Sequence, residues 1–215
     1  MIKTFRVLSH FLSYPGRDLQ TFLYEGTGEL QKEKILDDRI LEGIREFAAF
    51  YSDMDLIDWQ ASYVSLFDTS RNTSLYIFEH LKGDSKERGQ AMNDLLEFYR
   101  DNGLVLTQGE LPDYLPVFLE FISDIEMPKA AELLSQPVNV INRICLVLKK
   151  NNNPYRHVFE AIISLSSEKP GDEVPEAGAG NILNEGCDEL YNEPPAFGCE
   201  TLNPENQTNK PWEII

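Results

Sequence analysis

Two carboxylates and an aromatic residue lie close together in the stretch ELPDY, residues 110–114. Glu110 and Asp113 are the carboxylates, and Tyr114 is the aromatic residue. General acid–base catalysis would pair such a carboxylate with a nucleophile, a metal or a histidine, and none of these lies nearby in the sequence. The same residues on a proline-stiffened loop suit recognition of an arginine-bearing amphipathic peptide. We therefore expect peptide binding, with a hydrolase that uses Asp113 or His80 as the alternative.

A second polar stretch, SLYIFEHLKGDSKERGQAMNDLLEFY, spans residues 74–99. His80 beside Glu79 could form an acid–base pair, but adjacent residues on a helix point apart, which favours a histidine with an ordinary structural hydrogen bond. Arg88 could pair with Glu79 or clamp a carboxylate through two hydrogen bonds. Gly89 falls in the first turns of a helix, where glycine costs about 0.5–1 kcal/mol relative to alanine. Its presence predicts the close approach of a packed helix or of a bound peptide.

Turn-forming residues in this stretch also have a structural explanation. Residues 75–81 are predicted to form a short apolar helix. Asp84 suits a helix N-cap, and Glu87 can reach back to complete a capping box. Gly103 is predicted to end the following helix in the left-handed conformation, with Leu104 making the accompanying apolar contact.

The rest of the first part of the chain predicts helices almost throughout. Apolar residues recur at helical spacing in residues 5–12, 35–51, 59–67, 115–122, 140–148 and 159–165. No segment of sustained alternation predicts strands, and the Asn102-Gly103 pair does not join two such segments into a hairpin. We therefore expect one all-α domain over residues 1–167, a single-domain bundle of six to nine helices.

The remainder, residues 168–215, is rich in proline, glycine and acid. It contains eleven Asp and Glu residues against two Lys and Arg residues. Few apolar residues and a high like charge cannot offset the entropy lost on ordering, so a disordered acidic tail is expected.

Overall charge and residue content exclude several classes of function. The net charge of -17 disfavours binding to nucleic acid and to anionic membranes. No apolar run approaches the roughly 20 residues that span a bilayer, and the N-terminus lacks the apolar core of a signal peptide. The phosphate-binding pattern GxxxxGK[ST] and the zinc-binding pattern HExxH are both absent.

Cysteines and histidines give no sign of a metal site or a disulfide framework. Cys145 lies on an apolar helix face and is expected to be a buried thiol. Cys187 and Cys199 are too far apart for a CxxC site, and the three histidines are widely separated. These counts favour a reducing compartment.

Long motifs in this chain resemble the NarJ family, the assembly chaperones of respiratory nitrate reductase that are also called its delta subunit. The resemblance rests on SLYIFEHLKGDSKERGQAMNDLLEFYRDNGLVL followed by ELPDYLPVFLEF, and on the earlier WQASYVSLFDTSRNTS and LSHFLSYPGRDL. It covers roughly residues 2–165. It implies an all-helical fold of the redox-enzyme maturation chaperone type, a cytoplasmic location and no catalysis.

The resemblance also implies a client and a role. The client would be the apo catalytic (alpha) subunit of nitrate reductase, recognised through its N-terminal leader-like segment. The chaperone would bind no cofactor permanently. It would keep the client competent for insertion of the molybdenum bis-guanine-dinucleotide cofactor and an iron–sulfur cluster before membrane docking, with cofactor-biosynthesis proteins as further partners. The alternative is a chaperone of the same fold for another molybdoenzyme, such as a sulfoxide or selenate reductase.

In the wider group of maturation chaperones, a Glu-Pro-Asp-His type motif marks the leader-binding region. The matching run here has Tyr114 where histidine is usual, and an acidic-aromatic contact survives this change. No catalytic and no metal-binding residue is expected. The expected peptide-binding residues are Tyr63, Phe67, Glu79, His80, Arg88, Gly89, Met92, Glu110, Pro112, Asp113, Tyr114 and Phe118.

These residues predict a specific groove geometry. The apolar lining would come from Tyr63, Phe67, Met92, Tyr114 and Phe118. The acids at the rim would be Glu79, Glu110 and Asp113, and Arg88 with Gly89 would shape the groove or its hinge.

Overall fold

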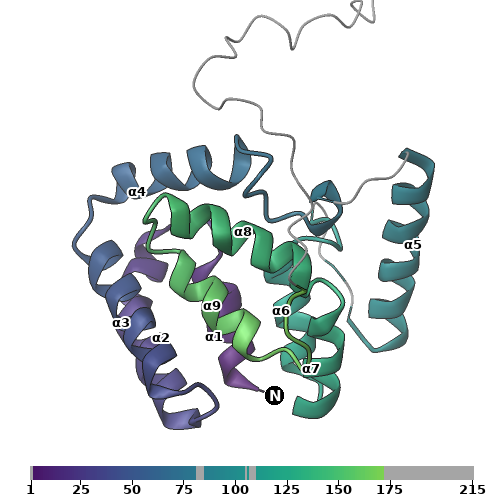
Figure 1. Ribbon diagram of the computed structural model, residues 1–215, viewed down its shortest axis with the longest axis horizontal. Helices are drawn as coiled ribbons and strands as arrows, with labels where there is room; N and C mark the ends of the chain where they lie inside the picture. The colour runs from purple at the N-terminus through teal and green to yellow at the C-terminus, as the bar shows by residue number, and fades with distance from the viewer. Residues whose placement is uncertain (1, 81–84, 105, 107–109, 172–215) are drawn as a thin grey trace, which may run out of the picture. The chain divides into compact units, whose positions relative to one another are not determined.

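The computed structural model describes residues 2–80, 85–104, 106 and 110–171, and the side chains of residues 85–87 are outside that description (Figure 1). The chain divides into two units, Met1–Val174 and Pro175–Ile215. The account below concerns the first unit. The tail predicted for residues 168–215 lies outside the described residues from position 172 onward, so its disorder stays a prediction.

Helices make up nearly all of the regular secondary structure in the described residues, which confirms the all-α prediction. The helices are α1 (Lys3–Phe11), α2 (Arg17–Glu33), α3 (Asp38–Ser52), α4 (Leu56–Tyr63), α5 (Ser85–Asp101), α6 (Leu115–Ser123), α7 (Met127–Ser135), α8 (Val138–Lys150) and α9 (Arg156–Ser164). A π-helix, η1 (Val64–Asp68), continues α4, and a 3-10 helix, η2 (Ile77–His80), precedes α5. Within the described ranges the only β-pairing is an isolated bridge between Tyr76 and Tyr114.

Helix ends follow the local chemistry of the sequence. Asp37 caps α3 by accepting a hydrogen bond from the Ile40 amide at 2.8 Å. Gly103 ends α5 with a φ of 84°, and the Leu104 amide donates to the Tyr99 carbonyl at 2.9 Å. This is the left-handed helix end predicted from the glycine.

Two helices, α2 and α7, were absent from the apolar pattern of the sequence. α2 contains two glycines, which lower helix propensity. A Cβ atom added at Gly26 would lie 2.9 Å from a ring carbon of Phe22 and 3.0 Å from one of Phe11. The glycine therefore permits close packing of α2 on α1, and this tertiary contact outweighs the local cost.

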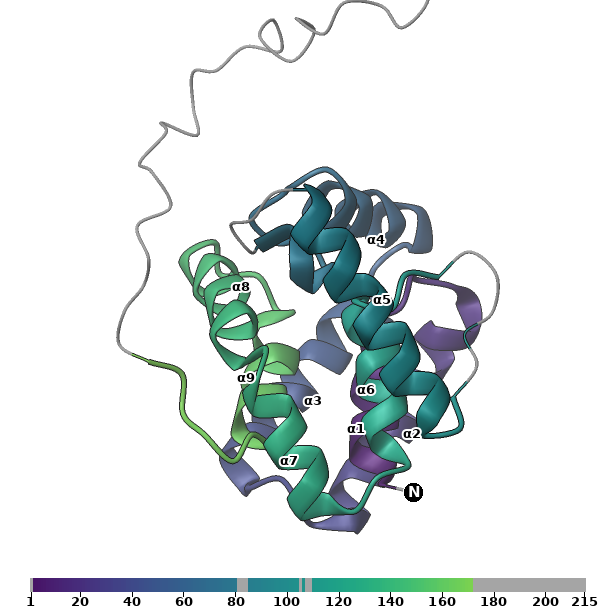
Figure 2. The same cartoon turned by 90° about the vertical axis from the view of Figure 1, so that its right-hand side faces the viewer.

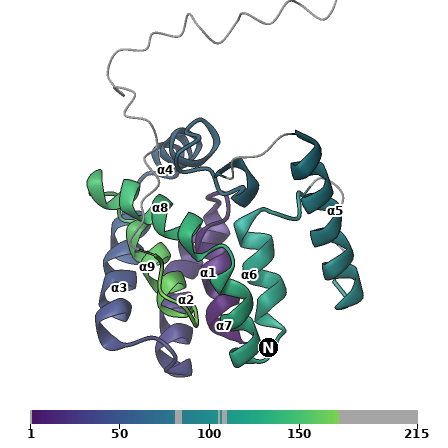
Figure 3. The same cartoon turned by 45° about the vertical axis from the view of Figure 1, so that its right-hand side comes forward.

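The helix α1 lies at the centre of the unit (Figure 3) and packs against α2, α6 and α9. α3 packs on α2 and α9, and α8 packs on α9. The core is strongly aromatic where α3, α4 and the start of α9 meet. There the rings of Tyr51 and Trp59 stack at 5.0 Å, and the Trp59 indole donates to the Tyr155 hydroxyl at 3.0 Å.

The helix α5 lies on the outside of α6 (Figures 1 and 2). Its C-terminal half carries the contact, because the Phe98 ring meets Phe121 edge-on at 5.4 Å and the Tyr99 ring lies 4.6 Å from the same residue. Tyr99 is fully buried.

The region before α5 differs from the prediction. Residues 75–80 do not form a helix throughout, and residue 81 of the predicted helix lies outside the described residues. Residues around Tyr76 enter the bridge with Tyr114, and only Ile77–His80 turns into a 3-10 helix. Pairing with a distant segment replaces the local helix that the apolar pattern predicted. The predicted capping residue Asp84 lies outside the described residues, as does the side chain of Glu87.

Candidate peptide-binding site

The two motif segments meet directly in space. The Ile77 amide donates to the Asp113 carbonyl at 3.0 Å, and the Leu115 amide donates to the Leu75 carbonyl at 2.9 Å. The rings of Tyr76 and Tyr114 face each other across this pairing at 5.2 Å. Residues far apart in the sequence thus form one local structure at the start of α6.

Asp113 lies inside this structure, not at a rim. Its side chain is 1% exposed, and Oδ2 accepts a hydrogen bond from the Phe78 amide at 3.0 Å. Its Oδ1 atom is buried with no partner from another described residue. Burial raises the pKa of this carboxyl above its ordinary value, with the Phe78 hydrogen bond opposing the shift. The prediction of Asp113 as a rim carboxylate is therefore wrong. The N-cap of α6 is Tyr114.

Tyr63 and Tyr114 lie at hydrogen-bond distance beneath the surface. The Tyr63 hydroxyl donates to the Leu12 carbonyl at 2.8 Å and lies 3.2 Å from the Tyr114 hydroxyl. Burial raises the pKa of both phenols, that of Tyr114 to about 12. Both are neutral near pH 7. Tyr63 is 2% exposed, so it supports Tyr114 from below and does not line an open groove as predicted.

The other aromatic residues of the predicted groove also belong to the core. Phe67 on η1 is 2% exposed and meets the Tyr155 ring edge-on at 4.9 Å. Phe118 is buried on α6. Their helical spacing turns them toward α9 and the rest of the core, so the predicted apolar lining by Tyr63, Phe67 and Phe118 is wrong.

Pro112 is buried as well. Its carbonyl accepts a hydrogen bond from the Tyr99 hydroxyl at 2.8 Å. This contact fixes the loop before α6 to α5. Pro112 therefore holds the loop in place and offers no contact surface of its own.

His80 has the ordinary structural role that its helical setting favoured. Its Nε2 atom lies 2.8 Å from the Ser74 carbonyl, to which it donates. The Arg143 guanidinium in turn donates to the His80 carbonyl at 3.3 Å. Burial lowers the pKa of His80, although the bond to Ser74 opposes the shift. Glu79 is half-buried beside it.

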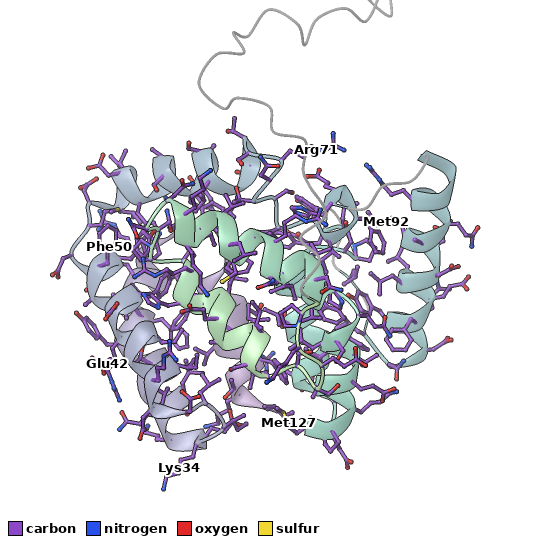
Figure 4. All side chains as sticks on the ribbon, in the orientation of Figure 1. Lys34, Glu42, Phe50, Arg71, Met92 and Met127 are labelled. Carbon is purple, nitrogen blue, oxygen red and sulfur yellow. The ribbon has the colours of Figure 1, made fainter. Side chains whose placement is uncertain are left out.

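Three predicted residues lie on α5, and they are the least enclosed. Arg88 and Gly89 are exposed, and a Cβ atom added at Gly89 would meet no atom within 4 Å. The close helix contact predicted from Gly89 is therefore absent among the described residues. Nor does any ion pair join Arg88 to Glu79 within them. Met92 is half-buried on the side of α5 nearer to the rest of the unit (Figure 4).

Two of the predicted residues, Glu110 and Tyr114, line a common hollow of about 320 Å³. We call it the α1–α6 hollow. Its lining residues are Ser9, Ser13, Leu104, Leu106, Glu110, Tyr114, Pro116, Val117 and Glu120. Apolar side chains thus lie next to two carboxylates, and Leu111, which is 49% exposed, follows Glu110 in the sequence.

Several residues of this site were not foreseen from the sequence. Ser9 is buried, and its hydroxyl donates to the Pro116 carbonyl at 2.7 Å, which joins α1 to the start of α6. Tyr76 pairs with Tyr114, and Tyr99 holds Pro112. The tyrosine in each motif segment could have suggested the Tyr76–Tyr114 pairing, whereas a lone serine in an apolar helix carries no such signal.

Comparison with known proteins identifies the family. A family model described as "Nitrate reductase delta subunit" matches residues 34–161. The chain belongs to the nitrate reductase delta subunit family. The chain is 34% identical over 161 residues to the nitrate reductase molybdenum cofactor assembly chaperone NarJ of Escherichia coli K12, covering 75% of this chain and 68% of that one. It is also 30% identical over 164 residues to a Bacillus subtilis protein named as a probable chaperone of the same kind, covering 75% and 86%.

A solved structure supports the fold of this family member independently. An Archaeoglobus fulgidus protein assigned to redox enzyme maturation matches with a TM-score of 0.54 at 22% identity, over 74% of this chain and 90% of that one. Together these matches confirm the predicted resemblance and fold class, in a family of assembly chaperones and not of catalysts. None of the helices in the described residues has both the length and the apolar character needed to cross a membrane. The same residues contain no cluster of three or more His, Cys, Asp or Glu side chains suited to a metal ion.

Proposed function

We propose that this delta subunit family member is a system-specific assembly chaperone for a respiratory nitrate reductase. It binds the N-terminal leader-like segment of the apo catalytic subunit in the cytoplasm. It thereby keeps that subunit competent to receive the molybdenum bis-guanine-dinucleotide cofactor and an iron–sulfur cluster. Proteins of cofactor biosynthesis are further partners. The names of the similar chaperones support the client and the cofactor.

The observation that carries the binding site is the α1–α6 hollow. It combines apolar side chains, Leu104, Leu106 and Val117, with the carboxylates Glu110 and Glu120. An amphipathic basic segment has the complementary chemistry, since its apolar face can enter the hollow while its cations meet the acids. Exposed ion pairs contribute only about 0–1 kcal/mol each, so the apolar contacts supply most of the affinity.

Buried residues of the motif act by holding this hollow in shape. Asp113 ties η2 to the loop before α6 through the Phe78 amide. Tyr63 supports Tyr114 from the core side. These two contacts keep Tyr114 and Glu110 in place for the client. Asp113 and Tyr63 themselves do not touch the peptide.

Calorimetric titration with a synthetic peptide of the client's N-terminal segment tests this proposal. The variants are Glu110→Gln, which removes one acid of the hollow, and Val117→Ala, which removes half-buried apolar surface. We expect saturable one-to-one binding, with the larger loss of affinity in Val117→Ala. The control is Glu126→Gln, an exposed acid at the N-cap of α7, beyond the end of α6.

Failure can take two forms in this titration. If neither variant weakens binding relative to Glu126→Gln, the client binds elsewhere on the protein. If the unaltered protein does not bind the peptide, the leader segment is not the recognised element.

A further inference from the structure

A second hollow lies beside the first, between the end of α1 and the start of α2. It has a volume of about 440 Å³, and its lining residues are His10, Ser13, Tyr14, Gly16, Asp18, Leu19 and Phe22. We call it the α1–α2 hollow. Most of its residues belong to the motif LSHFLSYPGRDL, of which only Ser9 and Ser13 line the hollow used by the proposed function.

The two hollows adjoin each other along α1. Ser13 lines both of them. Tyr14 of the α1–α2 hollow packs edge-on against the Tyr63 ring at 5.5 Å, and the Tyr63 hydroxyl reaches Tyr114 of the α1–α6 hollow at 3.2 Å. Ser13, a small side chain shared by both linings, therefore lies where a peptide seated over Tyr114 would enter the second hollow.

Aromatic side chains and one carboxylate line the α1–α2 hollow together. The His10 and Phe22 rings lie 5.6 Å apart, centroid to centroid. Tyr14 is 54% exposed, so part of its side chain remains available to a partner. Asp18 is an exposed carboxylate in the first turn of α2. Ring faces and a carboxylate together attract a Lys or Arg side chain, which binds aromatic faces through its charge.

The charge of the whole lining is one-sided. Its carboxylates are Asp18, Glu110 and Glu120, and no Lys or Arg is among the described residues that line either hollow. Glu120 is the one with a cation beside it, since Arg6 lies 3.4 Å away. Asp18 and Glu110 form none of the ion pairs found within the described residues. Both remain available to a basic partner.

We propose that the two hollows form one continuous peptide groove, and that the α1–α2 hollow takes a single Lys or Arg side chain of the bound segment. This inference rests on the proposed function, because the occupant is the client peptide. Tyr114, Leu104 and Val117 hold the apolar part of the segment. Asp18 and Tyr14 hold the cation, which lies on the other side of Ser13 from the apolar part of the segment.

The test combines a protein variant with a set of peptide variants. The full chain and its Asp18→Asn variant are titrated with the client's N-terminal peptide and with peptides in which each basic residue in turn is Gln. We expect Asp18→Asn to lower the affinity for the parent peptide by about 3–10-fold. This is the scale of one partly screened ion pair with an aromatic contact. For one of the Gln peptides, Asp18→Asn should cause no further loss of affinity, because the cation that Asp18 binds is already missing. The position of that Gln identifies the bound cation. The control, Asp38→Asn, removes an exposed acid from the first turn of α3 instead.

A second variant tests the continuity of the groove. Ser13→Lys places a long cationic side chain where the two hollows meet. It is expected to lower the affinity for the parent peptide by at least as much as Asp18→Asn does. The inference is overturned if the peptide binds, Val117→Ala weakens it, and both Asp18→Asn and Ser13→Lys match the Asp38→Asn control. In that outcome the proposed function stands and the groove ends at Tyr114. Absence of peptide binding to the unaltered protein overturns both proposals together.

Discussion

Gly43 offers a sharp test of the packing between α3 and α9. A Cβ atom added there would lie 2.4 Å from Nδ1 of His157 and 3.0 Å from its Cγ. The imidazole cannot simply swing aside, because its two nitrogens each lie 3.2 Å from a carboxylate oxygen, one of Glu46 and one of Glu160. The ring is also largely buried. Gly43→Ala should therefore force a displacement of either the ring or the helix.

The magnitude follows from two opposing effects. Overpacking in a filled interior costs about 1–3 kcal/mol, and alanine regains up to about 1 kcal/mol of helix propensity over glycine. We expect a net loss of about 1–2 kcal/mol in the free energy of unfolding. For a chain of this size that corresponds to a fall in Tm of about 3–6 °C.

Thermal and urea unfolding of matched variants measure this effect. Gly28→Ala in α2 is the control, since a Cβ atom there meets nothing within 4 Å, and it should raise stability by about 0.5–1 kcal/mol. In a His157→Ala background the clash is gone, so Gly43→Ala should no longer destabilise. The reasoning is refuted if Gly43→Ala behaves like Gly28→Ala, or if its cost is the same with and without the His157 ring.

Two further predictions concern buried titratable groups. Burial raises the pKa of Asp113 above the ordinary value of 3.8, so its contribution to stability is present below that value and is lost as the pH rises through the raised pKa. Asp113→Asn removes this titration, so the stability of the variant relative to the unaltered protein should increase as the pH rises above 3.8 and through the raised pKa. A difference in urea unfolding that does not vary with pH would contradict the assignment. Burial also raises the pKa of the Cys145 thiol to about 11, so Cys145 should react with a thiol reagent only after unfolding, and rapid labelling of Cys145 in the native protein, located by peptide mapping, would show that the site is open.

Strong apolar periodicity made most of the helices predictable. The stripes in α1, α3, α6, α8 and α9 bury the residues that their spacing indicates. α2 was missed because its glycines lower local propensity, while its stability depends on the contact of Gly26 with Phe11 and Phe22. A glycine at such a contact adds no apolar residue to the helical pattern, so the sequence of α2 does not reveal it.

The candidate site was predictable only in part, for physical reasons. Glu110 and Tyr114 were found as an acidic and aromatic pair and do line a hollow. Asp113 is two residues from an exposed leucine, and only the backbone pairing with Ile77 turns its side chain inward. Aromatic residues at helical spacing, such as Tyr63 and Phe67, have the same pattern whether they line a groove or fill a core, and here they fill the core.

The central claim is that the client segment binds across α1, between the start of α6 and the start of α2. Amide chemical-shift mapping of the full chain during titration with the client's N-terminal peptide tests it most directly. We predict that the largest shifts fall on residues 9–22 and 110–117, with residues 139–164 of α8 and α9 little changed. Saturable shifts centred on α8 and α9, with the α1 residues unaffected, would contradict the account.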